Sequence, residues 1–487
     1  QRVGLLTGSH RFQNFWIHAG YGNTQYILPF SWIIKDNRWV PISEVFLKPP
    51  DEPSVIQVWN NQCIVCHASA PQPRKQQDSM VFDSRTAEIG ISCESCHGPA
   101  EEHVARYRNP LTRYRNHFTD DSETGIRNPE KMDHRLSSQV CGQCHSARIN
   151  FEPQLMTQGT TYRPGKGLHE SFGILLPGRP DSLPGLRRNI EEDPEFYQGT
   201  FWPDGIIRVT GREFNSLLVT PCFERGEMSC LSCHSSHDSD PNDQLAEGMR
   251  TNQACIQCHD SFSDKLTQHT RHSAGSSGSL CYNCHMPHTT YGLLGAIRNH
   301  YIDSPNVKKT LETGRPNACN SCHLDKTLAW TNNQLKEWYG TAPADLNESQ
   351  KSTAASILNL LSGDANQRVL TAWAMGWKPA REVSGEDWIP HYLVEAMKDN
   401  YSTIRYIAHK SLINIPGYEN TDFDFVAAES VRTAIIGRIP LSPTLLDSQR
   451  VPDQQRVLLF DSVGRLMRDE VRIHINRRDT KPISLME

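Results

Sequence analysis

The sequence predicts a mainly α-helical protein with extensive loops, small β-hairpin elements near the N-terminus and in residues 146–229, and a C-terminal α-helical repeat-like domain. Three observations predict this fold class. Aromatic-rich stretches with strand-like composition occupy the first 60 residues. Fifteen cysteines follow, most of them at short intervals. After about residue 345 the cysteines stop, and apolar residues recur with helical spacing.

The first 60 residues are expected to form a β-hairpin. Residues 25–34 (QYILPFSWII) and 38–40 (RWV) have the composition of strands, and Asp36 and Asn37 lie between them as a turn. We expect this segment, residues 1–60, to pack against the cysteine-rich region that follows.

Cysteine spacing is the most informative pattern in the chain. Seven C-x-x-C-H motifs use fourteen of the fifteen cysteines and leave only Cys222, which we expect to be a buried free thiol, with an unusual ligand role as the alternative. The motif cysteines are Cys63, Cys66, Cys93, Cys96, Cys141, Cys144, Cys230, Cys233, Cys255, Cys258, Cys281, Cys284, Cys319 and Cys322. The motif histidines are His67, His97, His145, His234, His259, His285 and His323.

This spacing has a chemical reason. Two thiols three positions apart can both add to the vinyl groups of one haem, and the next histidine is then placed to ligate the iron. Zinc ribbons, the main alternative, pair C-x-x-C units into four-cysteine sites but do not explain a histidine after every second cysteine. A disulfide framework explains it even less. The sequence therefore predicts seven covalently attached c-type haems, and the histidines as iron ligands.

The predicted heptahaem domain covers residues 61–340. The first cysteines of successive motifs are 30, 48, 89, 25, 26 and 38 residues apart, so haems should supply most of the core between 60 and 325. The hydrophobic fraction of 37% agrees with this, because even with glycine it reaches only about 43%, under the 45–50% usual for globular domains.

A haem-free excursion occupies the longest interval, at 146–229. It is rich in proline and glycine, and a turn at 203–205 precedes a strand-like stretch at 206–210. We expect it to cover haem edges; a docking surface is the alternative.

The last predicted domain, residues 345–487, is α-helical and HEAT-like. Breaks at 362–364 and 416–417 separate the helical segments, and residues 401–412 resemble the second helix of a HEAT repeat. Such domains normally serve as scaffolds or contact partners.

Fourteen histidines lie outside the motifs, and eleven of them precede residue 325. This supply is sufficient to give every haem a second histidine ligand. His237 and His288 each follow a motif histidine by three residues, so each can point toward a neighbouring iron. His269 and His272 form an H-x-x-H pair ahead of Cys281.

Four segments carry a family resemblance: GISCESCHGPAEEH at 90–103, GEMSCLSCHSSH at 226–237, CHMP at 284–287 with RNH at 298–300, and PNACNSCHLDK at 316–326. They resemble multihaem (heptahaem) c-type cytochromes whose haem region precedes a HEAT or TPR-like helical region. The resemblance covers about residues 55–340. It implies distal iron ligands at His103, His237, His272 and His300. His269, His18 and His10 are our next choices, whereas His288 and His134 fall where the family pattern often has other residues.

These features predict an electron-transfer protein. A chain of seven haems would carry electrons to and from redox partner proteins, including neighbouring cytochromes or copies of itself, in a larger complex or a haem-wire polymer. The alternative is an oxidoreductase of nitrogen or sulfur compounds with one open-coordinate haem, although the chain has no C-x-x-C-K motif. We expect no dedicated catalytic residues.

Composition and haem chemistry also limit partners and location. The net charge of −5 and the dispersed charges make a nucleic-acid partner unexpected. Covalent haem attachment occurs outside the cytoplasmic membrane, so we expect a periplasmic, extracellular or cell-surface protein. No apolar run is long enough for a transmembrane segment, and no leader pattern is present, so Gln1 is expected to begin a processed chain, with an arbitrary boundary as the alternative.

Overall fold

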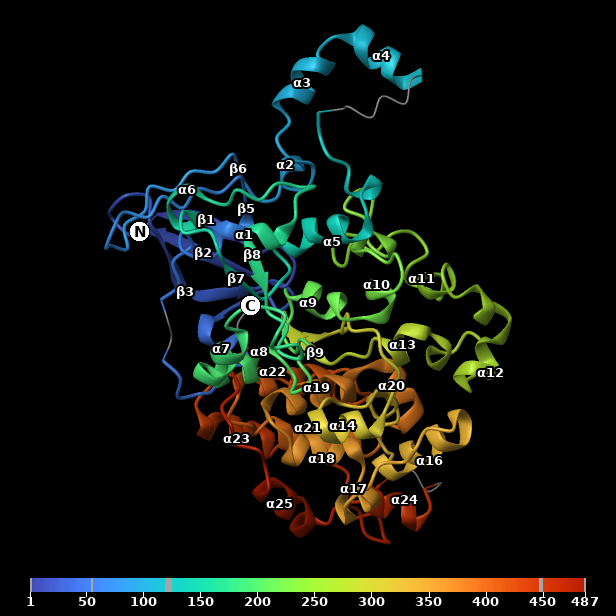
Figure 1. Ribbon diagram of the computed structural model, residues 1–487. Coiled ribbons are helices and arrows are strands. Elements are labelled where there is room, and N and C mark those ends of the chain that lie inside the picture. The colour runs from blue at the N-terminus through green and yellow to red at the C-terminus, as the bar shows by residue number, and fades with distance from the viewer. Residues whose placement is uncertain (1, 54–55, 119–124, 446–449, 486–487) are drawn as a thin grey trace.

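An antiparallel four-stranded meander forms the N-terminal region of the computed structural model, which describes residues 2–53, 56–118, 125–445 and 450–485. Its strands are β1 (Val3–Thr7), β2 (Phe12–His18), β3 (Gln25–Ile33) and β4 (Arg38–Pro41), adjacent in that order (Figure 1). The predicted hairpin is present as β3 and β4, with Trp32 opposite Trp39. Asn37 in its turn has a φ of 52°, which asparagine tolerates better than most residues. The first two strands extend the hairpin beyond what the sequence predicted.

The inner face of this sheet joins two parts of the molecule. Trp16 and Ile27 pack with Trp59 and Ile64, beside the first cysteine motif. Ile33 and the strand β4 instead enter the large core of the C-terminal helices. Two ion pairs also join the sheet to the helical region: Arg38 with Asp424 at 2.9 Å and Lys410 with Asp36 at 2.6 Å. The sheet therefore contacts both the cysteine-rich region and the helical region.

Each cysteine motif lies on or beside a short helical turn. The elements concerned are α1 (Ile64–His67), α2 (Cys93–His97), α5 (His134–Gly142), the 3₁₀ turn Cys230–Ser232, α11 (Gln253–Ile256), α13 (Cys281–His285) and α15 (Ala318–Cys322). Residues 224–290, all of which the structure describes, contribute no hydrophobic side chain to the buried core. This stretch therefore has no apolar core of its own.

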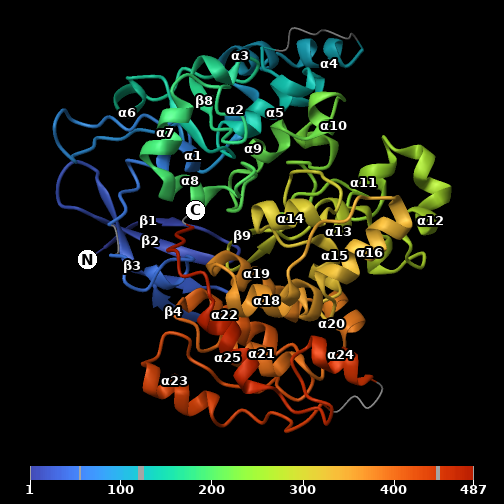
Figure 2. The ribbon, with the colours of Figure 1, turned by 60° about the horizontal axis from the view of Figure 1, so that its bottom comes forward.

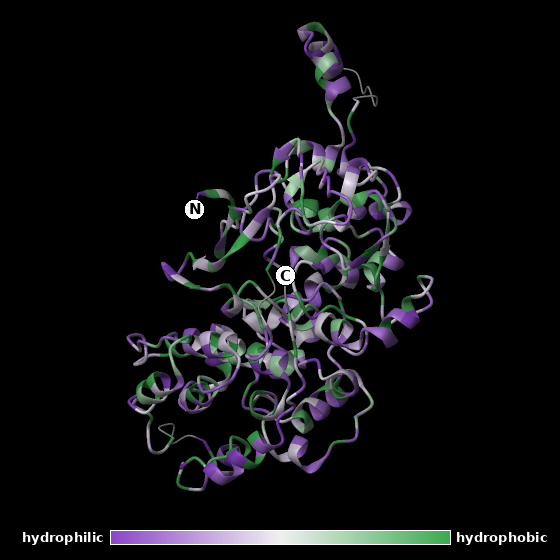
Figure 3. Ribbon diagram, turned by 90° about the vertical axis from the view of Figure 1, so that its left-hand side faces the viewer, coloured by the Kyte–Doolittle hydropathy of each residue, from purple (hydrophilic) through white to green (hydrophobic). Residues whose placement is uncertain are grey.

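Short elements connect the motifs. The paired strands are β5 (Ala68–Ser69) with β6 (Glu88–Ile89) and β9 (Thr290–Gly292) with β10 (Gly295–Ile297). The connecting helices are α3 (Glu101–Tyr107), α4 (Pro110–Phe118), α12 (Leu266–Thr270), α14 (Val307–Thr313) and α16 (Leu328–Tyr339). Helices α3 and α4 form an arm that projects from the rest of the molecule (Figures 1 and 3).

The excursion at 146–229 is ordered and contains one small sheet, β7 (Arg148–Asn150) with β8 (Phe172–Ile174). Its helices are α6 (Leu155–Gln158), α7 (Leu186–Glu192), α8 (Pro194–Thr200), α9 (Glu213–Leu218) and α10 (Pro221–Glu224). The predicted turn ends at Gly205, whose φ is 81°. The stretch 206–210 makes only isolated bridges, Ile207 with Phe201 and Val209 with Tyr291, so the prediction of a strand there was wrong.

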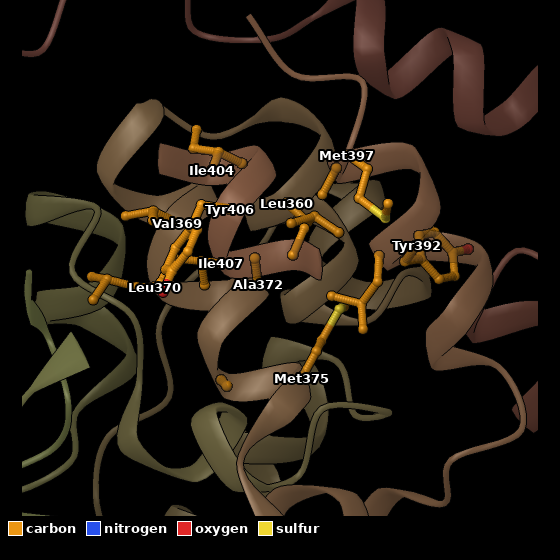
Figure 4. Packing of buried hydrophobic residues seen from close by; sticks show 14 of the residues in the cluster. Leu360, Val369, Leu370, Ala372, Met375, Tyr392, Met397, Ile404, Tyr406 and Ile407 are labelled. Carbon is orange, nitrogen blue, oxygen red and sulfur yellow. The ribbon is translucent and has the colours of Figure 1, made fainter. Parts of the chain in front are cut away.

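Helices dominate the chain after residue 345, as predicted. They are α17 (Glu348–Ser352), α18 (Ala355–Ser362), α19 (Ala365–Gly376), α20 (Lys378–Ser384), α21 (Ile389–Ala396), α22 (Ser402–Leu412), α23 (Glu429–Ile436), α24 (Pro452–Val457) and α25 (Arg468–Asn476). Asp364 begins α19 with a capping box to Gln367, which explains the break at 362–364. Helices α18 to α22 bury Leu360, Met375 and Ile404 in one core (Figures 2 and 4).

Within the described part of the chain, no helix has the length and apolar character needed to cross a membrane.

Candidate haem sites

The short helical turns orient the cysteine and histidine side chains of each motif relative to one another. Residues three apart lie on the same face of a helix, so the two cysteines of a motif present their sulfurs side by side, with the histidine next to them. Three motif histidines direct Nδ1 at a backbone carbonyl: His97 at Arg127 (2.5 Å), His234 at Asp243 (3.0 Å) and His285 at Asp303 (2.8 Å). A histidine whose Nδ1–H donates in this way has an unprotonated Nε2, the form that binds a metal.

Four of the motif histidines face a histidine from outside the motifs. The pairs are His97 with His237, His234 with His300, His285 with His269, and His323 with His272, and their ring centres are 6.0 to 6.2 Å apart. The ring planes of the first three pairs are within 20° of parallel, and those of the fourth pair differ by 37°. Each pair joins residues from different motifs or loops, so the fold itself creates the arrangement.

The separation fits two ligands of one metal ion. A metal–imidazole bond is about 2 Å, so two imidazoles on opposite sides of an ion have ring centres about 6 Å apart. A haem iron has two axial positions arranged in this way, and the porphyrin nitrogens fill the other four. The residues of these four sites therefore fit haem, with the two motif cysteines placed beside each histidine pair.

The sequence assigned seven distal histidines, and the structure brings four of them to a motif: His237, His300, His269 and His272. The ring of His272 is further fixed by Nδ1 at 2.6 Å from the backbone oxygen of Thr270. His237 follows His234 by three residues but faces His97, so motifs two and four are neighbours. That is the behaviour expected of a histidine close to another motif.

The other three assigned histidines have different surroundings. His18 is exposed, with Nε2 at 2.9 Å from the oxygen of Gly22 and Nδ1 accepting from the backbone N–H of Gly20. His10 is exposed beside Ser9, and His103 packs against Tyr107 on the projecting arm. Their roles as ligands stay predictions.

The remaining histidines before residue 325 are held by other contacts or lie apart. His134 contacts the backbone oxygen of Phe223 at 3.2 Å, and His169 is exposed near the start of β8. His288 packs against Trp373 and Trp377 of the helical region instead of a motif histidine. The side chain of His117 lies outside the described residues.

The position of His288 leads to a prediction about pH. Burial, and to a smaller extent the charge of Arg298, lowers the pKa of His288 to about 3. The unfolded chain takes up a proton near pH 6.5, whereas the folded protein resists protonation until about pH 3. Stability from this site is therefore complete above pH 6.5 and is lost as the pH falls toward 3. We expect His288→Phe to flatten the dependence of the urea midpoint on pH between 7 and 4; an unchanged slope would contradict it.

Sulfur contacts show which motifs are neighbours. The thiols of Cys66 and Cys144 lie within hydrogen-bonding range, which lowers the pKa of Cys66 to about 5 and raises that of Cys144. The same contact between Cys141 and Cys230 raises the pKa of Cys141 and lowers that of Cys230. These contacts place motif three beside motifs one and four.

The remaining motifs follow in chain order. A contact with Cys255 lowers the pKa of Cys281 to about 7, so motifs five and six are adjacent. Burial, followed by the nearby thiol of Cys284, raises the pKa of Cys319 to about 12, so motif seven lies beside motif six. Burial and then Cys258 similarly raise the pKa of Cys233, which places motif five beside motif four. Motifs one, three, four, five, six and seven thus form one continuous series, and the pair of His97 and His237 places motif two beside motif four.

None of the fifteen cysteines, all of which lie in the described part of the chain, forms a disulfide. Zinc ribbons would gather four ligands at one point, and the described residues contain no group of three or more His, Cys, Asp or Glu arranged to hold a metal ion by themselves. Cys222 forms no disulfide, as expected, but it is half-buried and not buried as predicted, and this partial burial raises the pKa of its thiol.

Motif three has a different histidine partner. Nδ1 of His145 lies 3.0 Å from Oε2 of Glu213, the first residue of α9. Burial alone would raise the pKa of Glu213, but the hydrogen bond and the charge of His145 hold it at about 2. Sequence reasoning missed Glu213, because it lies 68 positions from His145 and belongs to no motif.

The excursion supplies a wall beside the early motifs. Seven buried side chains of the excursion form an apolar cluster: Leu155, Tyr162, Leu168, Phe172, Phe214, Leu217 and Phe223. Val65 of motif one and Cys230 of motif four pack against this cluster. Arg148 lies over the ring of Phe172, 4.2 Å from its centre, and its guanidinium reaches the sulfur of Cys66. Arg298 is held by backbone oxygens of Tyr282 and Met286 around motif six.

Comparisons with known proteins agree with the motif chemistry. Residues 223–264 match the family model described as doubled CXXCH motif, and residues 50–98 match the one described as cytochrome c554 and c-prime. Together with the motifs, these matches support a multihaem c-type cytochrome with covalently bound haem c and a role in electron transfer.

No curated protein matches the chain. Among solved structures, the chain is similar to one titled outer cell wall cytochrome OcwA, with 18% identity, a TM-score of 0.46, and coverage of 84% of this chain and 86% of that chain.

Proposed function

We propose that the protein conducts electrons through seven covalently attached haems, one at each C-x-x-C-H motif. The four facing histidine pairs carry this proposal, since each has the separation that two axial ligands of one iron require. Distal ligands at four haems are then His237, His300, His269 and His272. His10, His18 and His103 remain the candidates for the other three.

The motif series supports a continuous path. Sulfur contacts link motif one to motif three, three to four, and five to six. Nearby thiols link four to five and six to seven, and the pair of His97 and His237 places motif two beside motif four. Electrons tunnel efficiently only over short distances, so neighbouring porphyrins are the basic requirement of a conduit. The chain's own role is to set each potential through ligands, burial and hydrogen bonds.

The apolar surface of the porphyrins also explains why this part of the chain buries so few hydrophobic side chains. Residues 224–290 carry three motifs and no buried hydrophobic side chain. Haem faces packed between these motifs would supply the missing contacts, and the apolar cluster of the excursion would cover haem edges near motifs one and four.

We further propose an extracytoplasmic location, periplasmic or at the cell surface, because covalent haem attachment takes place outside the cytoplasmic membrane. Redox partner proteins, neighbouring cytochromes or copies of the same chain would then exchange electrons with it. The helical region after residue 345, proposed as a HEAT-like domain, offers a scaffold for such contacts.

Two measurements on the purified holoprotein test the proposal. Intact mass should correspond to the chain plus seven haems, and a smaller number would contradict the motif argument. Electron paramagnetic resonance of the oxidised protein should be dominated by low-spin iron. A high-spin haem whose signal changes on adding nitrite, hydroxylamine or sulfite would instead favour the alternative, an oxidoreductase of nitrogen or sulfur compounds.

A further inference from the structure

Motif three differs from its neighbours in the group that its histidine contacts. His97, His234 and His285 each direct Nδ1 at a neutral backbone carbonyl. His145 directs Nδ1 at the carboxylate of Glu213, at 3.0 Å. A hydrogen bond to an ionised acceptor is about twice as strong as one between neutral groups.

The Glu213 carboxylate is held in place from its other side. Its Oε1 accepts from the backbone N–H of Gly211 at 2.8 Å and from the Thr210 hydroxyl at 3.0 Å. The carboxylate therefore accepts from three donors on both of its oxygens, of which His145 is one. A carboxylate fixed in this way cannot swing away when the charge at the neighbouring iron changes.

The two chain segments are also joined by their backbones. The N–H of Phe214 donates to the carbonyl of His145 at 3.0 Å. The amide side chain of Asn215 both accepts from the N–H of Ala147 at 2.7 Å and donates to its carbonyl at 3.0 Å. This double connection fixes the start of α9 against the end of motif three, so the distance from Glu213 to His145 is built into the fold.

We propose that Glu213 is a positioning residue that lowers the reduction potential of the third haem relative to haems whose histidine contacts a carbonyl. The inference rests on the proposed function, because it requires a haem at motif three with His145 as its ligand. The carboxylate attracts the Nδ1 proton and makes the imidazole a stronger electron donor, which favours ferric over ferrous iron.

The position of the third haem gives this lowering a consequence. Motif three contacts motif one, since the sulfur of Cys144 lies 3.9 Å from the backbone oxygen of Cys66. It also contacts motif four, since the backbone N–H of Cys230 donates to the hydroxyl of Ser138 in α5 at 3.3 Å. Electrons that pass between the first haem and the fourth along these contacts therefore cross the third. If the third haem has a low reduction potential, electron transfer onto it is unfavourable in free energy, and Glu213 determines how unfavourable it is.

Glu213→Gln tests the inference, since it removes the charge and preserves the size of the side chain. The full haem-loaded protein is titrated by spectroelectrochemistry, with intact mass confirming equal haem content. One of the seven potentials is expected to rise while the others stay in place. Glu224→Gln is the matched control, because Glu224 lies in the same excursion and pairs with Arg179 instead of a motif histidine. It should leave every potential unchanged.

Glu213→Asp separates the hydrogen bond from the charge. Aspartate keeps the charge, but it is one methylene shorter and cannot reach His145 while it stays bonded to Thr210 and Gly211. The same potential should rise in this variant too. The inference would be overturned if all potentials were unchanged in both variants or if all seven shifted equally. It would also be overturned if the aspartate variant kept every potential of the wild type. A wild-type protein without seven haems would instead overturn the proposed function.

Discussion

Replacing His300 by alanine is expected to convert one haem, the fourth, from low-spin to high-spin iron. The ring of His300 faces His234 with centres 6.1 Å apart and planes 20° from parallel. Alanine has no group that can ligate iron, so the sixth position opens to water or to an added ligand. The measurement is the electron paramagnetic resonance spectrum of the oxidised protein, followed by cyanide binding, which should saturate at one additional equivalent per chain.

His288→Ala is the matched control for this prediction. His288 lies three residues after a motif histidine, as His237 does, but its ring packs on Trp373 and Trp377. Its loss should reduce stability by removing packing contacts and leave the spin state of every haem as in the wild type. If His300→Ala keeps a wholly low-spin spectrum, or if His288→Ala produces a high-spin signal, the proposed ligand assignment is wrong.

Local sequence patterns predicted the elements that depend on neighbouring residues. The helical pattern at 401–412 corresponds to α22 (Ser402–Leu412), because one face of that segment is apolar at the helical period. The pair Asp36 and Asn37 marks the turn between β3 and β4, since asparagine tolerates a positive φ. Motif spacing likewise assigned a candidate proximal histidine to each motif, because the pattern for attachment of one haem lies within five residues.

Features that depend on distant contacts could not be read in the same way. The stretch 206–210 has strand composition, but Arg208 extends to Asp364 at 2.6 Å and also lies over the ring of Trp202. Its backbone bonds to β9 only at Tyr291, which accepts from the N–H of Thr210 at 2.9 Å and donates to the carbonyl of Arg208 at 3.0 Å. β-propensity mainly reports fit to a pleated surface, and here no second strand offers one along the full stretch.

The pairing of histidines shows the same limit at the candidate site. The sequence supplied His237, His269, His272 and His300 as ligands but not their partners. His237 follows motif four and faces motif two, while His300 follows motif six and faces motif four. Only the packing of one motif against another decides such pairs. Glu213 was missed for the same reason, because a single carboxylate becomes informative only beside His145.

The stability of the helical region is expected to depend strongly on one buried carboxylate, Asp399. It accepts from Nε of Arg368 at 2.9 Å and from a guanidinium nitrogen of Arg478 at 3.1 Å. It also accepts from the backbone N–H of Tyr401 at 3.0 Å. Asp399 and Arg368 are both almost completely buried. Asp399 therefore connects the end of α21, the start of α22, α19 and the C-terminal segment.

Asp399→Asn keeps the shape of the side chain and removes its charge. Two arginines then lose their shared counter-ion, one of them deep in the core, and breaking a buried pair in this way costs about 3–5 kcal/mol. The expected result is a lower urea midpoint for the loss of helical circular dichroism. Glu348→Gln is the control, because Glu348 is exposed and its pair with Lys351 should contribute at most about 1 kcal/mol.

The haem spectrum distinguishes a local effect of Asp399→Asn from general misfolding. The facing histidine pairs come from residues 97–323, whereas Asp399 and its partners lie at 368–478. At low urea, the variant should therefore keep the haem content and low-spin spectrum of the wild type. Equal stability of variant and wild type would contradict the prediction, because it would mean that other groups balance the charges of the two arginines. A changed haem spectrum without urea would mean that the helical region helps to position the ligands, as its contacts with the N-terminal sheet and with Arg208 allow.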